Sequence, residues 1–285
     1  MSKFRRVWIL IATYFVSTHS INAEYIDPNS CYIPYENAEE CYCDVPPTPC
    51  FKGHIFSIGP EVYHVKRTRS GGTQQNGTGV GVRATYDHIK RYRLYWGGVA
   101  FYGSDLLDGH SASHEHIRSR LTDTQIEGNV GYTLGTKNFP CFLFTPFVGY
   151  GYFRERNRFA HPSPLHVTLT THFQYVSYGF LSSAMVNSWL KVGLNARFRS
   201  LLDTRCTVTH DPDFGRIKLL VGDRLHYRIE LPFTYCGPLY YQGFELGLVP
   251  FYENRTYGGR ENFPFDFFET KLRIYGVNFQ LIYQF

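Results

Sequence analysis

The stretch from Tyr275 to Phe285 constrains the fold more than any other part of the sequence. Its odd positions are all apolar or aromatic, and its even positions are mostly polar or small. Alternation with a period of two predicts a β-strand with one apolar and one polar face. Ten steps of about 3.3 Å, tilted by roughly 40°, span about 25 Å, the height of the apolar layer that a transmembrane strand crosses. The next two residues on the same face of the strand are Arg273 and Lys271, at the height where lipid headgroups would begin.

This stretch resembles the C-terminal strand of bacterial outer-membrane β-barrel proteins, which ends in an aromatic residue preceded by apolar residues at alternate positions. The resemblance implies that the barrel-assembly machinery reads the strand, through an insertion signal formed by Phe279, Leu281, Tyr283 and Phe285. It also implies that Lys271 and Arg273 meet outer-membrane lipid or lipopolysaccharide. The alternative is the last edge strand of a soluble β-sandwich.

The N-terminal residues carry an export signal. Residues 1–23 combine Lys3, Arg5 and Arg6 with the apolar run Val7–Val16 and small residues before Ala23. This arrangement predicts a cleaved secretory signal peptide, because its apolar run is too short for a spanning helix. We therefore expect export, with the mature chain in the bacterial outer membrane.

Residues 24–52 form a separate segment with four cysteines and five prolines. Prolines at this density exclude a regular helix or strand of any length. In an oxidising compartment the cysteines suggest disulfides, whereas their spacing fits no zinc pattern. We expect a cysteine-rich periplasmic segment, followed by a β-barrel over residues 53–285.

Ten strands are predicted after residue 53, and their connections alternate in length. The strands are expected at 54–68, 78–88, 93–104, 121–135, 141–155, 169–184, 188–200, 223–235, 240–253 and 267–285. Long polar loops fall near 69–77, 105–120, 156–168, 201–222 and 254–266, and short turns lie between them. Outer-membrane barrels have this alternation and an even strand number. The fold class is therefore all-β: a transmembrane antiparallel up-and-down barrel of about ten strands, or twelve if Gly215–Val221 pairs within the fourth long loop.

Strand parity predicts which charged residues face the lumen, and position along the strands predicts an outer basic set. The predicted lumen-lining residues are Glu61, Arg83, Glu127, Lys191, Arg197, Arg199, Arg224, Arg228, Glu230 and Glu245. The predicted basic residues at the outer strand ends are Lys66, Arg67, Arg69, Arg118, Arg120, Arg154, Arg156, Arg158, Lys271 and Arg273. Lipopolysaccharide phosphates would meet the outer set, although loop solubility explains such charges as well. The lumen set permits ion pairs that fill the barrel, or a passage with a basic wall.

The expected topology also sorts the cysteines. Cys31, Cys41, Cys43, Cys50, Cys141 and Cys236 fall on the periplasmic side and are disulfide candidates, whereas Cys206 falls in an outer loop. We expect Cys206 to stay free or to pair between molecules. The alternative is that the barrel cysteines are small apolar residues. With its many cysteines the sequence resembles the cysteine-rich outer-membrane proteins of chlamydia-type bacteria. This resemblance implies disulfide-linked envelope proteins as partners.

Function is less constrained than fold. The most favoured function is structural, or a narrow porin-like channel with a weak anion preference; the alternatives are a surface adhesin and an omptin-like outer-membrane protease. Asp108-Gly-His110 and Asp211-Pro-Asp213 are similar to the omptin pairs, but they occur in the opposite order and inside predicted loops. We expect no enzyme and no cofactor. We also expect no metal site, although His110, His114, Glu115 and His116 could bind zinc or copper. The net charge of +5 is dispersed, so no nucleic acid is expected.

Overall fold

The computed structural model describes residues 53–135, 142–164, 166–187, 189–212, 215–222, 224–236, 243–262 and 266–285, and every regular element in them is a β-strand. No helix formed by these residues is long and apolar enough to cross a membrane. The predicted signal peptide (residues 1–23) and cysteine-rich segment (residues 24–52) lie outside the described residues, so both stay predictions.

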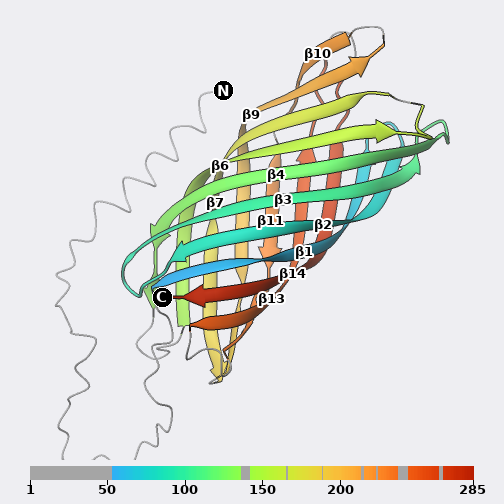
Figure 1. Cartoon of the computed structure of the whole chain (residues 1–285). Coiled ribbons are helices and arrows are strands. Elements are labelled where there is room, and N and C mark those ends of the chain that lie inside the picture. Colours follow the sequence, from blue (N-terminus) through green and yellow to red (C-terminus); the bar gives the residue numbers. More distant parts are fainter. Residues whose placement is uncertain are drawn as a thin grey trace, which may run out of the picture. The chain divides into compact units, whose positions relative to one another are not determined.

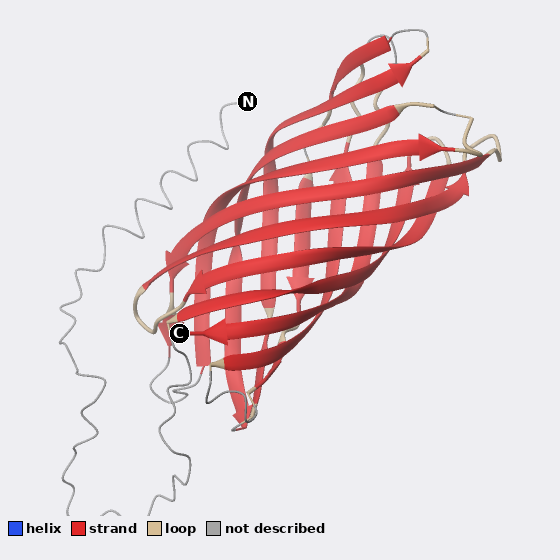
Figure 2. Ribbon diagram, in the orientation of Figure 1, coloured by secondary structure: helices blue, strands red, loops and turns tan. Residues whose placement is uncertain are grey.

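The strands form one closed antiparallel barrel, with long and strongly tilted strands (Figures 1 and 2). They are β1 (His54–Arg69), β2 (Thr73–His88), β3 (Leu94–His110), β4 (His116–Tyr132), β5 (Leu134–Gly135), β6 (Phe142–Ala160), β7 (Thr168–Asn187), β8 (Leu190–Gly193), β9 (Asn195–Asp211), β10 (Gly215–Leu220), β11 (Leu225–Glu230), β12 (Phe233–Tyr235), β13 (Phe244–Tyr257) and β14 (Thr270–Gln284).

Ten strand positions close the barrel, as predicted. β8 and β9 both pair with β7 and together make one position, and β11 and β12 both pair with β13 and make another. The barrel closes where β1 pairs with β14, with Glu61 opposite Asn278. The short β5 pairs only with β6 among the described strands.

The twelve-strand alternative is wrong, although part of its premise holds. Gly215–Leu220 does pair, as β10, but its described pairing is with β9, where Lys218 lies opposite Thr207. This segment therefore folds back as a hairpin that lengthens the wall, and it adds no new position to the ring.

The long outer loops are shorter than predicted, because the strands continue into them. β3 reaches His110 and β4 begins at His116, and β9 extends to Asp211. The predicted strands stop where the outward-facing side chains cease to be apolar. Beyond that level the outward faces are polar while backbone pairing continues, so the barrel wall extends past the apolar belt.

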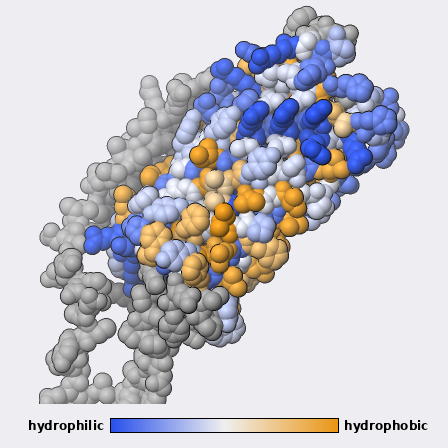
Figure 3. Space-filling view, viewed as in Figure 1, coloured by the Kyte–Doolittle hydropathy of each residue, from blue (hydrophilic) through white to orange (hydrophobic). Residues whose placement is uncertain are grey.

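The outer surface carries an apolar belt over the part of the wall nearer Phe285, and hydrophilic side chains over the opposite part (Figure 3). On β14 the outward side chains Tyr275, Phe279, Leu281 and Tyr283 are 38–52% exposed. Exposed apolar side chains on the other strands include Val62, Val80, Tyr102, Ile126, Val130, Val148, Tyr150, Leu194, Ile229, Leu246 and Leu248. A closed barrel with such an apolar belt can span a lipid bilayer, because its strands pair their backbone groups all round the ring and the side chains of the belt are apolar.

The hydrophobic core lies inside the barrel. A cluster of buried apolar side chains, called here the inner apolar cluster, comes from strands all round the ring, and its members are at most 9% exposed. They include Val65, Leu107, Leu121, Phe153, Phe173, Tyr175, Cys206, Val208, Leu219, Phe251, Tyr257, Phe267 and Leu272. Most of these residues lie in the half of the strands away from Phe285, where they pack among buried polar side chains such as Arg67, Asn157 and Thr204.

Candidate functional site

A buried ion-pair network crosses the middle of the barrel, and Arg228 on β11 lies at its centre. The Arg228 side chain is 1% exposed. Its Nη2 donates to Glu61 Oε2 at 2.9 Å, and its Nε donates to Glu230 Oε1 at 2.7 Å. Its Nη1 donates to Glu253 Oε2 at 3.1 Å. The guanidinium also lies 3.7 Å from the ring centroid of Phe251, a cation–π contact.

Glu61 links this centre to the strands beside the closure of the barrel. Arg83 Nε donates to Glu61 Oε2 at 2.6 Å, and Asn278 Nδ2 donates to the same oxygen at 3.3 Å. β1, β2, β11 and β14 thus meet at one carboxylate. A charge can persist here because several charge-assisted hydrogen bonds replace its water.

Glu253 extends the network in the other direction. Its Oε1 accepts from Arg199 Nη1 at 2.7 Å and from Arg255 Nε at 2.8 Å. Arg255 Nη1 also donates to Asp123 Oδ2 at 2.6 Å. Glu253 is therefore held by three arginines, counting Arg228, and it joins the middle of the barrel to the apolar half.

Glu127 on β4 completes the described network. Its Oε1 lies 3.0 Å from Arg197 Nε, and its Oε2 lies 3.6 Å from Arg199 Nε and accepts from the Tyr175 hydroxyl at 3.0 Å. Further from Phe285, inside the half that holds the inner apolar cluster, the Tyr257 hydroxyl donates to Glu155. The carboxylates thus form ion pairs with the arginines that were expected to give the lumen a basic wall.

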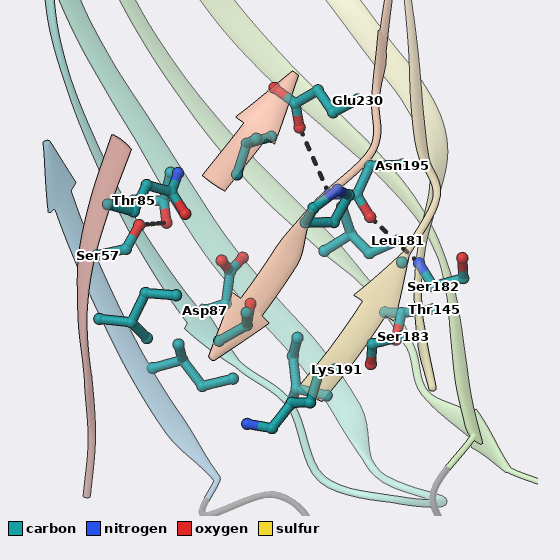
Figure 4. A pocket seen from close by; sticks show the side chains of 18 of the residues that line it. Ser57, Thr85, Asp87, Thr145, Leu181, Ser182, Ser183, Lys191, Asn195 and Glu230 are labelled. Carbon is teal, nitrogen blue, oxygen red and sulfur yellow. Dashed lines mark hydrogen bonds between the residues drawn. The ribbon is translucent and has the colours of Figure 1, made fainter. Parts of the chain in front are cut away.

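A cavity of about 170 Å³ opens at the end of the barrel that carries the short turns. Figure 4 shows Asp87, Glu230, Asn195 and Lys191 around it, with Ser57 and Thr85 hydrogen-bonded on one wall. Lys191 Nζ donates to Glu245 Oε1 at 2.5 Å. The cavity wall is largely apolar, and the three basic and three acidic side chains that line it, among them Arg83, Arg197 and Glu230 of the ion-pair network, balance in charge.

Nine of the ten residues predicted to line the lumen have side chains inside the barrel, and eight of these are at most 8% exposed: Glu61, Arg83, Glu127, Lys191, Arg197, Arg199, Arg228 and Glu245. The Glu230 side chain is 14% exposed and also points inward. Arg224 is the exception and corrects the prediction. It precedes β11, its side chain is 60% exposed, and its Nη2 lies 3.5 Å from Glu269. The strand begins one residue later, so the inward parity does not reach Arg224.

Several network residues were missed by the sequence reasoning. Glu253 was taken as the last residue of its strand, and Arg255 and Tyr257 were assigned to a loop, yet all three lie in β13 and point inward. Continuing the odd-position alternation from Glu245 past residue 253 would have found them. Asp123 and Glu155 lie in predicted strands on the inward parity but were passed over.

The cysteines differ from the prediction. Cys206 lies in β9 and not in an outer loop, and it is a free thiol with no exposed surface, so it is unavailable for pairing between molecules. Cys236 was a disulfide candidate but is a free, buried thiol whose Sγ lies 3.8 Å from the Thr234 carbonyl oxygen. The other candidates, Cys31, Cys41, Cys43, Cys50 and Cys141, lie outside the described residues.

The predicted lipid-facing residues lie on the outer wall. Phe279, Leu281, Tyr283 and Phe285 are 38–56% exposed. Arg273 is exposed and Lys271 half-buried beyond them. Two members of the predicted basic outer set point the other way: Arg67 is buried and donates to Gln75 Oε1 at 3.3 Å, and Arg69 lies against Phe267. Reading by the insertion machinery stays a prediction.

The two Asp/His clusters lie on separate hairpins. Asp108 and His110 end β3, and Asp108 Oδ1 lies 2.5 Å from His116 Nε2, with both side chains exposed. His210 and Asp211 end β9, and three strands separate β9 from β3. At about 4.8 Å per strand spacing, the clusters are roughly 19 Å apart along the wall, far beyond the reach of one shared water. Within the described residues no group of three metal-ligating side chains could hold an ion, and Asp213 lies outside them.

No protein-family profile and no curated protein matches this sequence. Solved structures of bacterial outer-membrane proteins are similar to it. The outer-membrane protease OmpT from Escherichia coli superposes with a TM-score of 0.53 at 12% identity, covering 82% of this chain and 96% of that chain. The outer-membrane protein OprG from Pseudomonas aeruginosa gives 0.40 at 11% identity, covering 82% and 98%. Neisserial surface protein A gives 0.35 at 12% identity, covering 81% and 97%.

The OmpT superposition, at low identity, shows a shared fold and nothing about activity. The chain is thus a closed ten-stranded β-barrel of the bacterial outer-membrane type, and its fold and apolar belt place it in an outer membrane. The resemblance to chlamydia-type proteins has no support.

Proposed function

We propose that this outer-membrane barrel is a structural protein with a sealed interior, and not an open channel. The observation that carries the proposal is the inner apolar cluster, whose 22 buried side chains pack inside the barrel beyond the ion-pair network, together with buried polar side chains. Side chains just fill the interior of a ring of about eight strands, and a ten-stranded ring is only somewhat wider. Ions would have to lose their water to pass these packed side chains, which is strongly unfavourable.

The charge distribution also argues against the expected anion preference. Arg83, Arg197, Arg199, Arg228 and Arg255 each lie within 3.6 Å of a carboxylate inside the barrel. A wall whose arginines are neutralised in this way has no net positive field with which to select anions.

The exposed ends of the strands support a second role as a surface-interaction protein. β3, β4 and β9 continue past the apolar belt and end in exposed polar residues such as Asp108 and His116. A catalytic role for these residues has weaker support, because the Asp108 and Asp211 clusters lie on separate hairpins.

The proposal is tested by ion and solute efflux from lipid vesicles that contain the refolded barrel. We expect chloride and a small sugar to leave no faster than from protein-free vesicles, while a conducting porin in the same lipid releases both. Chloride efflux in proportion to barrel content would refute a sealed interior.

A further inference from the structure

Five arginines, four of them exposed and Arg118 half-buried, gather on the outer wall, on the adjacent strands β4 and β6. This outer arginine cluster consists of Arg118, Arg120, Arg154, Arg156 and Arg158. In the β4–β6 register Arg120 lies directly opposite Arg158, and Arg156 and Arg154 follow at alternate positions of the same face. Alternate residues on a strand lie about 6.6 Å apart and neighbouring strands about 4.8 Å apart, so the guanidinium groups cover one compact surface.

The cluster begins where the apolar belt ends. The outward side chains of β6 are apolar or aromatic from Phe142 to Tyr152, and Arg154 is the next one. Ten steps along this tilted strand cover about 25 Å of height, a full apolar band. The closure strands repeat the arrangement, since Lys66 on β1 lies opposite Arg273 on β14 just beyond Tyr275.

The arginines of the cluster have no compensating charge in the described parts of the chain. None of the five forms an ion pair there. The acidic residue opposite Arg118 is Asp108, which contacts His116 at 2.5 Å. Like charges placed directly opposite each other across two strands are unfavourable, so the Arg120–Arg158 pair destabilises the bare barrel. In contrast, Arg83, Arg197, Arg199, Arg228 and Arg255, which are buried inside the same barrel, are each paired with a carboxylate.

We propose that the outer arginine cluster binds the phosphate groups of a phosphorylated glycolipid headgroup in the outer leaflet. Arginine forms bidentate, charge-assisted bonds with phosphate, and a cluster of five offers room for two phosphates. Tyr150 and Tyr152 lie directly below Arg154, at the depth where a lipid's acyl chains begin. A lipid phosphate carries its negative charge at this height, and bound between the opposed arginines it offsets their repulsion. The site is independent of whether the barrel interior conducts.

The proposal is tested by measuring the dissociation constants of lipid A, a bisphosphorylated glycolipid, and of its dephosphorylated form from the barrel in zwitterionic detergent. The test variant is Arg120→Gln/Arg158→Gln. The control, Arg216→Gln/Lys218→Gln, removes the same charge from exposed positions of β10. We expect the wild type and the control to prefer the bisphosphorylated lipid. The test variant should bind it roughly tenfold to thirtyfold more weakly, and wild-type binding should weaken as salt is added.

A second measurement separates lipid binding from a general effect on the fold. In lipid-free detergent, Arg158→Gln should melt at a higher temperature than the wild type, because it removes an opposed like charge. Lipid A should raise the melting temperature of the wild type more than that of the variant.

Three results would each overturn the proposal. The two double variants could lose affinity equally, which would indicate attraction by net charge alone. The two lipid forms could bind alike, which would exclude phosphate recognition. Inorganic phosphate could displace lipid A at comparable concentration, which would make free phosphate the ligand.

Discussion

Replacing Arg228 by Met should destabilise the barrel by about 3–5 kcal/mol, the cost of leaving buried carboxylates without their partner. Arg228 donates to Glu61, Glu230 and Glu253 and lies over the ring of Phe251. Glu61 keeps Arg83, and Glu253 keeps Arg199 and Arg255. Within the part of the chain that the structure describes, Glu230 keeps only a long hydrogen bond from Asn195 Nδ2 at 3.4 Å, so most of the cost falls on Glu230.

The assay is denaturant unfolding of the barrel refolded in lipid vesicles, followed by the fluorescence of Trp96 and Trp189, which are both about half exposed on the outer wall. Arg224→Met is the matched control, because that side chain is 60% exposed and makes one ion pair. Its free energy of unfolding should change by less than about 0.5 kcal/mol. Adding Glu230→Gln to Arg228→Met should recover part of the loss, since it removes the orphaned charge. A loss below about 1 kcal/mol, or one equal to that of the control, would refute the assigned role of the network.

Three further predictions concern the two faces of the wall. Phe279→Arg should destabilise the barrel by about 2–4 kcal/mol if its position is near the midplane, because it places a charge in lipid; normal assembly and unchanged unfolding would contradict the membrane placement of β14. Phe173→Ala should cost about 3–5 kcal/mol in the same unfolding assay, since its ring has no exposed surface inside the inner apolar cluster; a cost under 1 kcal/mol would mean that this half is loosely packed. Cys206 should resist a bulky maleimide in the folded barrel and react after unfolding, as mass spectrometry would show, and rapid labelling of the folded barrel would disprove its burial.

The ring of strands could be predicted from the sequence because lipid and lumen impose opposite demands on alternate residues. Tyr275, Phe279 and Leu281 face outward and Asn278 inward, as the period of two requires. The alternation of long and short connections then gave the strand number. The alternation of apolar and polar residues weakens beyond the apolar belt, because the strands there carry polar side chains on both faces, as Asn254 and Arg255 do on β13. The predicted ends of β3, β9 and β13 were therefore misplaced.

The partners of the buried charges could not be predicted. Arg228 and Glu61 are 167 positions apart and meet only because the barrel closes with a particular stagger between β1 and β14. Parity assigns a residue to the lumen but gives neither its height nor its angular position. The sequence therefore indicated a mixed-charge interior, whereas the choice between a filled barrel and a basic-walled passage required the three-dimensional register.

Single-channel recording in planar lipid bilayers tests the central claim, a membrane-spanning barrel with a sealed interior, most directly. The refolded wild-type barrel, with its insertion verified by protease protection, should add no conductance steps at potentials where a porin in the same bilayer gives steps of uniform size. Reproducible steps from the wild-type protein would contradict the sealed interior, and they would show that the inner apolar cluster and the Arg228 network leave a water-filled path.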